Sequence, residues 1–144
     1  MKKFELTSET KINIFGKKLF RIKALISFGD VEAGETGGWV EKEGNVNQSG
    51  DAWVSGDAEV SGDARVFGDA MVSGNADYTT IHGFGTQFRT TTFFRCKDKK
   101  VRVACGCFFG TIPEFREQVK NTRKGKIAEE YLMIADLMEK HFEK

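Results

Sequence analysis

The side chains best suited to bind a ligand are arginines and threonines around residue 90. Arg95 and Arg102 fall on two stretches that read as strands of a hairpin, with Asp98 and Lys99 as its turn. This turn would place Arg95 directly across from Arg102, where like charges repel each other. Either carboxylates or a bound anion such as phosphate would relieve the repulsion. The candidate anion-binding set is Arg89, Thr90, Thr91, Thr92, Arg95 and Arg102, and the available carboxylates are Glu114, Glu117, Glu129 and Glu130.

The cysteines do not form a recognisable metal site. Cys96, Cys105 and Cys107 crowd into the predicted hairpin, on the apolar face of its strands. A zinc site built from them lacks an obvious fourth ligand, and the spacing is not that of a zinc finger or ribbon. We therefore expect small core residues with free thiols, no bound metal and no cofactor.

Histidine is scarce, with only His82 and His141 in the sequence. His82 could act as a general base in a cleft between subunits, but a local hydrogen bond is the simpler interpretation. No nucleophile with a paired base is visible, and Gly83-Phe84-Gly85 is too short to indicate a phosphate-binding loop. The sequence thus predicts no catalytic residue.

A repeat of six residues occupies the middle of the chain, from residue 50 to residue 79. Each repeat has an apolar residue at the same place, a small residue two positions earlier and a Gly-Asp or Gly-Asn pair before them. Alternate residues share one face of a strand, and glycine favours a corner. The pattern predicts a short solenoid with 18-residue coils over residues 28–83, and it resembles the left-handed parallel β-helix of hexapeptide-repeat proteins. The apolar series is Val54, Val60, Val66, Val72 and Tyr78.

Variable positions of the repeat should face outward. Trp53 is expected to stack one coil away from Met71, and Phe67 is an outward aromatic. These three residues could form an oligomer or partner contact, or they could be scattered surface apolar residues. Asp51, Asp57, Asp63 and Asp69 would form acidic corners, either solvated or imitating a row of phosphates.

The two ends of the chain should flank the β-helix. Residues 1–27 alternate in polarity and predict a β cap on the first coil. Residues 84–144 predict a ββαα module, a hairpin followed by two helices. The first helix should begin at Thr111, followed by Pro113 and by Glu114 at the capping-box position. The predicted fold class is therefore mainly β.

Opposite charges nearly balance, with 22 lysines and arginines against 21 aspartates and glutamates. A general nucleic-acid binder would usually be strongly basic, so the balance argues against that class. No stretch approaches the roughly 20 apolar residues needed to span a bilayer. The charged start, Met1 to Leu6, is not followed by an apolar run, so we expect no secretory signal. We expect a cytoplasmic protein without a membrane contact.

Three stretches together resemble a known family. They are residues 19–25 with 28–31 and 37–41, the repeats of residues 50–79, and residues 89–94 with 105–111. The set resembles hexapeptide-repeat proteins of bacteriophages and prophages, which are often labelled as transferases. The resemblance implies a phage accessory protein in a bacterial host, with a left-handed β-helix and no defined activity.

The functional expectation is a non-catalytic homo-oligomer that blocks a component of host immunity. It would either sequester a nucleotide-like signal with the arginine and threonine set, or cover a host defence protein with its outer faces or acidic corners. Two alternatives are a hexapeptide-repeat acyltransferase and a structural component of the virion.

Overall fold

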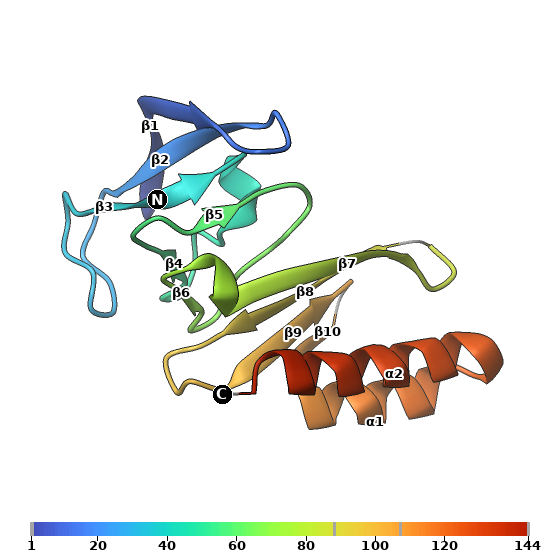
Figure 1. Cartoon of the computed structure of the whole chain (residues 1–144). Coiled ribbons are helices and arrows are strands. Elements are labelled where there is room, and N and C mark those ends of the chain that lie inside the picture. Colours follow the sequence, from blue (N-terminus) through green and yellow to red (C-terminus); the bar gives the residue numbers. More distant parts are fainter. Residues whose placement is uncertain (1, 88, 107, 144) are drawn as a thin grey trace.

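The computed structural model describes residues 2–87, 89–106 and 108–143. Its elements form three small sheets and two C-terminal helices (Figure 1). The strands are β1 (Phe4–Ile12), β2 (Lys18–Ala24), β3 (Thr36–Val40), β4 (Trp53–Val54), β5 (Glu59–Val60), β6 (Met71–Val72), β7 (Tyr78–Phe84), β8 (Arg89–Arg95), β9 (Val101–Cys105) and β10 (Phe108–Thr111). The helices are α1 (Ile112–Thr122) and α2 (Gly125–His141), and two 3-10 turns are η1 (Glu43–Asn45) and η2 (Asn75–Asp77).

The predicted left-handed β-helix is wrong. Among the described residues there is no parallel β-helix solenoid, and most strands pair antiparallel. Within the described ranges, parallel pairing is confined to β3 with β5, β4 with β6, and a single bridge between Val46 and Val66. The fold is mixed α/β and not mainly β.

The local features of the repeat are present, but they do not build long ladders. The corner glycines Gly50, Gly56, Gly62 and Gly68 all have positive φ, as their predicted turns require. The corners leave only two paired residues in each of β4, β5 and β6. Antiparallel strands also bound the repeats on both sides, because β2 pairs with β3 and a bridge joins Ala70 to Cys96. Stacked coils therefore do not continue in either direction.

The first core lies between the repeats and the sheet of order β1-β2-β3-β5. The valines and alanines of the first four repeats are buried there, and Val54, Val60 and Val66 are completely inaccessible, whereas Ala76 of the fifth repeat is exposed. The sheet comes close to the repeats at Gly37, where a Cβ atom would lie 2.6 Å from the Trp53 ring. Glycine at this position permits the tight contact.

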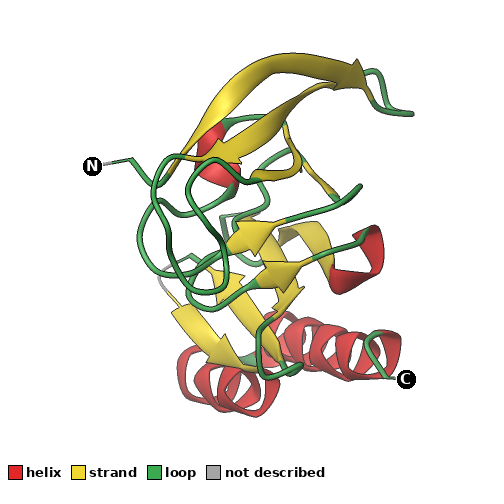
Figure 2. Ribbon diagram, turned by 90° about the vertical axis from the view of Figure 1, so that its left-hand side faces the viewer, coloured by secondary structure: helices red, strands yellow, loops and turns green. Residues whose placement is uncertain are grey.

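The second sheet, of order β10-β9-β8-β7, is shared by two cores. Both helices lie on one side of it and the repeat segments on the other (Figures 1 and 2). Because successive residues of a strand point to opposite faces, Phe93 packs with the helices and Phe94 packs with the repeats. The predicted ββ hairpin is thus the centre of a four-stranded sheet.

The register of the β8–β9 hairpin differs from the prediction by one residue. The loop has three residues, 97–99, because the Cys96 amide donates to the Lys100 carbonyl at 2.9 Å and Lys99 adopts φ +67°. Arg95 consequently pairs with Val101, and Arg102 pairs with Phe94. A shift of one residue moves a side chain to the other face, so Arg95 and Arg102 lie on opposite faces.

The predicted start of α1 is confirmed. The Thr111 hydroxyl accepts from the Glu114 amide at 3.2 Å, and the Glu114 carboxylate accepts from the Thr111 amide at 2.9 Å.

Neither helix in the described part of the chain is both long and apolar enough to cross a membrane.

Candidate functional site

Arg95, from the predicted anion-binding set, has protein partners. Its Nε lies 3.1 Å from Asp77 Oδ1, and its guanidinium also donates to the carbonyl oxygens of Lys99 and Phe142. The guanidinium lies 5.4 Å from the centre of the Phe142 ring. Arg95 therefore ties the sheet to the end of α2, and its charge is balanced by Asp77.

Arg102 is also paired with a carboxylate. Its Nη2 lies 2.8 Å from Asp98 Oδ2 in the hairpin loop. The hydrogen bond from Arg102 holds the pKa of Asp98 below its usual value. Carboxylates do partner both arginines, but they are Asp77 and Asp98 and not the helix glutamates that the sequence suggested.

The two central threonines are buried and bonded inside the protein. The Thr91 hydroxyl donates to Cys105 Sγ at 3.2 Å, and Thr92 Oγ1 accepts from the Arg65 amide at 3.1 Å. The predicted set is therefore split: Arg95 and Arg102 line two separate hollows, and Arg89 and Thr90 together line another.

We call this hollow the basic pocket. It has a volume of about 610 Å³ and lies where the third repeat corner meets β7 and β8. Three cationic side chains and one carboxylate line it. The lining residues are Lys42, Gly44, Asp63, Ala64, Arg65, His82, Arg89, Thr90 and Gly106.

Two guanidinium groups meet at Gly106 in the basic pocket. Arg65 Nη2 donates to the Gly106 carbonyl at 3.0 Å, and Arg89 lies over the Gly106 backbone, where any Cβ would collide with its Nη1. Gly106 also has φ +58°, which a side chain would oppose. Arg89 is oriented further by Gln87, whose Oε1 accepts from Arg89 Nε at 3.1 Å.

Arg65 and Arg89 have no ion-pair partner within the described ranges of the chain. By contrast, Lys42 forms an ion pair with Asp63 at 3.0 Å. The hydrogen bond from Lys42 lowers the pKa of Asp63, so this carboxylate is ionised and neutralises Lys42. The surplus positive charge of the pocket therefore resides on the two arginines.

His82 faces the pocket beside Thr90. Its Nδ1 lies 2.8 Å from Thr90 Oγ1, which confirms the predicted local hydrogen bond. Either tautomer satisfies this contact, because a hydroxyl can donate or accept. His82 and Thr90 thus add polar groups next to the two arginines.

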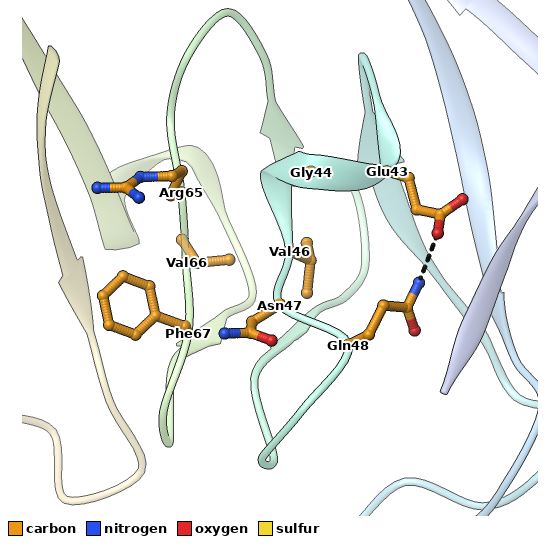
Figure 3. A pocket seen from close by; sticks show the side chains of 8 residues that line it. All are labelled: Glu43, Gly44, Val46, Asn47, Gln48, Arg65, Val66 and Phe67. Carbon is orange, nitrogen blue, oxygen red and sulfur yellow. Dashed lines mark hydrogen bonds between the residues drawn. The ribbon is translucent and has the colours of Figure 1, made fainter. Parts of the chain in front are cut away.

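A second hollow adjoins the basic pocket and shares Gly44 and Arg65 with it. Its volume is about 490 Å³. Figure 3 shows Val66 pointing toward Val46, whereas Arg65 and Phe67 point to the other side of their segment. The lining residues are Glu43, Gly44, Val46, Asn47, Gln48, Arg65, Val66 and Phe67.

The predicted contact residues are mostly covered. Trp53 does pair with Met71 as expected, but Trp53 is buried against Phe4 and Phe28 of the N-terminal region. Phe67 packs between strands against Phe94 and Phe109. Of the three predicted contact residues, Met71 alone is exposed.

The four acidic corners do not act as one group. Asp63 pairs with Lys42, and the Asp51 amide donates to the carbonyl of Gly68, which precedes Asp69. Asp57 and Asp69 are exposed. Only Asp51 and Asp69 therefore lie on neighbouring corners.

The described cysteines are free thiols. Cys96 is buried, and burial raises its pKa to about 11. Cys105 is half-buried, whereas Cys107 lies outside the described residues. No group of three histidine, cysteine or acidic side chains among the described residues could hold a metal ion.

Sequence reasoning missed Arg65 and Lys42 as pocket residues. Arg65 occupies the variable, outward position of the third repeat, which was treated only as surface. The available signal was that this outward position is basic in one repeat only.

A search of protein-family models gave no match to the chain, and a search of curated proteins gave none either.

Proposed function

We propose that the chain is a non-catalytic binding protein that holds a phosphate-bearing, nucleotide-like ligand in the basic pocket. The observation that carries this proposal is the meeting of Arg65 and Arg89 at Gly106 without a carboxylate partner in the described chain. Guanidinium groups bind phosphate through paired, charge-assisted hydrogen bonds. Arg65, fixed at the Gly106 carbonyl, and Arg89, held by Gln87 beside the Gly106 backbone, form a preorganised receptor for such an anion.

The adjoining hollow supports a nucleotide-like ligand over inorganic phosphate. Arg65 lines both hollows, so a phosphate bound beside it would leave the rest of the ligand next to Asn47 and Phe67. An amide and an aromatic edge suit the polar atoms and the ring of a base. The combined space exceeds what one phosphate group needs.

The biological role that we propose is sequestration of a nucleotide-like signal of host immunity by a phage accessory protein. Sequestration requires a site that binds the signal without converting it, and the paired arginines of the basic pocket supply binding groups for such a signal. A hexapeptide-repeat acyltransferase would need a β-helix to form its subunit cleft, and the described residues form none.

Titration calorimetry with ATP, cyclic AMP, cyclic di-AMP and adenosine tests this proposal. We expect binding of at least one phosphorylated compound and none of adenosine. Replacing Arg65 or Arg89 with alanine should weaken that binding about 10- to 100-fold, the value of one hydrogen bond to a charged group. Higher salt should weaken it further.

Arg116→Ala is the matched control, because Arg116 pairs with Asp136 and Glu139 on the helices and lies outside the pocket. Its affinity should equal that of the wild type. Equal binding of adenosine and the phosphorylated compounds, or unchanged affinity in both pocket variants, would contradict the proposal.

A further inference from the structure

The turn between β1 and β2 carries the two most exposed large apolar side chains of the described chain. Ile14 is 93% exposed, Phe15 is 80% exposed and Ile12 is 63% exposed. Figure 1 shows this hairpin projecting from the molecule on the side opposite the two helices. We call residues 11–18 the hairpin tip.

The hairpin tip has a defined backbone. Asn13 Oδ1 accepts from the amides of Phe15 and Lys17, both at 2.9 Å. The Asn13 amide donates to the Lys17 carbonyl at 2.9 Å, and the Gly16 amide donates to the Asn13 carbonyl at 3.0 Å. This Asn-centred turn holds the two most exposed apolar side chains at its apex.

Positive charge surrounds the apex. From Thr10 to Phe20 the sequence has three lysines and no acidic residue. Lys11 pairs with Glu59 at 2.7 Å, and Lys18 Nζ lies 5.4 Å from the centre of the Phe20 ring. Lys17 is exposed beside Phe15 and has no ion pair within the described ranges. The tip is therefore apolar at its apex and cationic at its base.

We propose that the hairpin tip inserts Ile14 and Phe15 into the surface of a bilayer that contains anionic phospholipid. Apolar side chains then enter the boundary of the acyl chains while lysines remain at the level of the head groups. Charge complementarity selects an anionic surface. The absence of a long apolar segment argues only against spanning a membrane, and a contact with the membrane surface needs no such segment.

A bilayer fits the tip better than a second protein does. A stable protein interface covers about 800 Å² on each partner, with roughly 20 to 30 residues and close shape complementarity. The tip offers a single turn, and β1 next to it is mostly polar from Thr7 to Thr10. A fluid surface adapts to a small projection and needs no matching pocket.

Vesicle co-sedimentation of the full chain tests the inference. We expect binding to vesicles of phosphatidylglycerol and phosphatidylcholine, and at least tenfold weaker binding to pure phosphatidylcholine. The double variant I14S/F15S should lose at least tenfold in partitioning to the anionic vesicles. K17Q/K18Q should also bind less, and the wild type should bind less in high salt.

The matched control is M133S/L137S, which removes two exposed apolar residues from α2 and should bind like the wild type. All the altered side chains are exposed, and thermal melts should show that each variant folds. No binding by the wild type, or full binding by I14S/F15S, overturns the inference. The inference is also overturned if the wild type does not bind vesicles but self-associates, and if I14S/F15S abolishes this self-association. That result would favour docking between copies of the chain.

Discussion

Two side-chain amides replace strand pairing that the repeats do not supply. Asn45 is fully buried, and its Oδ1 accepts from the amides of Glu41 and Lys42. Its Nδ2 donates to the carbonyl oxygens of Gly62 and Ala64, at 3.1 and 2.8 Å. One residue thus joins two segments far apart in the sequence. Buried polar backbone groups require such partners.

Gln48 performs the same task for the start of the chain. Its Oε1 accepts from the amides of Lys3 and Phe4, and its Nε2 donates to the Phe4 carbonyl at 3.3 Å. Lys3 is also buried, and its Nζ donates to the carbonyl oxygens of Gly50 and Ala52. Burial lowers the Lys3 pKa to about 8. The N-terminal segment is therefore attached to the repeats by polar contacts.

Cys96 should make stability depend on alkaline pH. Its pKa is about 11 in the folded protein and near 9 in the unfolded chain. The unfolded chain therefore loses its proton first, and the free energy of unfolding falls as pH rises from 9 to 11. Urea unfolding of the wild type and Cys96→Ala, at pH 8, 9.5 and 10.5 in reductant, measures this difference.

Between pH 9.5 and 10.5, the free energy of unfolding should fall less in Cys96→Ala than in the wild type, because the variant has no thiol to ionise. Lys3 shifts stability in the opposite direction over pH 8 to 10.5, but it is present in both proteins and cancels in the comparison. Identical pH dependence in the two proteins would show that Cys96 ionises alike in both states.

At the scale of the element, the loop of the β8–β9 hairpin decides which residues share a face. Lys99 adopts the left-handed conformation, which costs a residue with a side chain about 1 kcal/mol or more. Lys99→Gly should raise the free energy of unfolding by about 0.5 kcal/mol, after subtracting the entropy that glycine adds to the unfolded chain. Lys99→Val should lower it, because a branched side chain opposes this conformation.

Lys100→Gly is the control for the loop, since Lys100 does not have positive φ. Glycine there should lower stability slightly. Urea unfolding of the three variants gives the comparison. A loss of stability in Lys99→Gly equal to that in Lys100→Gly would mean that Lys99 carries no strain.

At the scale of the whole molecule, the sheet β10-β9-β8-β7 connects both cores and should make unfolding a single transition. Phe93→Ala removes a fully buried ring from the helix side and should cost about 3 to 5 kcal/mol. The two tryptophans of the sequence report on the repeat side: Trp53 belongs to the first core, and Trp39 lies on β3 next to β5. In Phe93→Ala, the unfolding transition measured by tryptophan fluorescence should move to lower urea concentration together with the transition measured by helical circular dichroism.

Met133→Ala is the control for this experiment, because Met133 is 70% exposed and should change neither signal. A fluorescence transition that stays at the wild-type urea concentration, while the circular dichroism transition moves, would show that the two cores unfold separately.

Local sequence patterns were sufficient for features that depend on neighbouring residues. In the first four repeats, burial of the valines and alanines follows from their spacing and the corner glycines have positive φ, and the α1 cap begins at Thr111. Arg89 and Thr90 were placed in a candidate anion site and do line the basic pocket. Each of these features is a matter of a few adjacent residues.

Long-range pairing decided everything else. A six-residue repeat buries its valines equally well in stacked coils or beneath an antiparallel sheet, so spacing did not exclude the wrong fold. One left-handed lysine shifted the hairpin register and separated Arg95 from Arg102. Arg65 and Arg89 are 24 positions apart in the sequence and meet at Gly106 only because β8 and β9 pack against the repeats. Periodicity sets which side chains are buried, but the partner of each strand depends on contacts between distant segments, which local patterns do not contain.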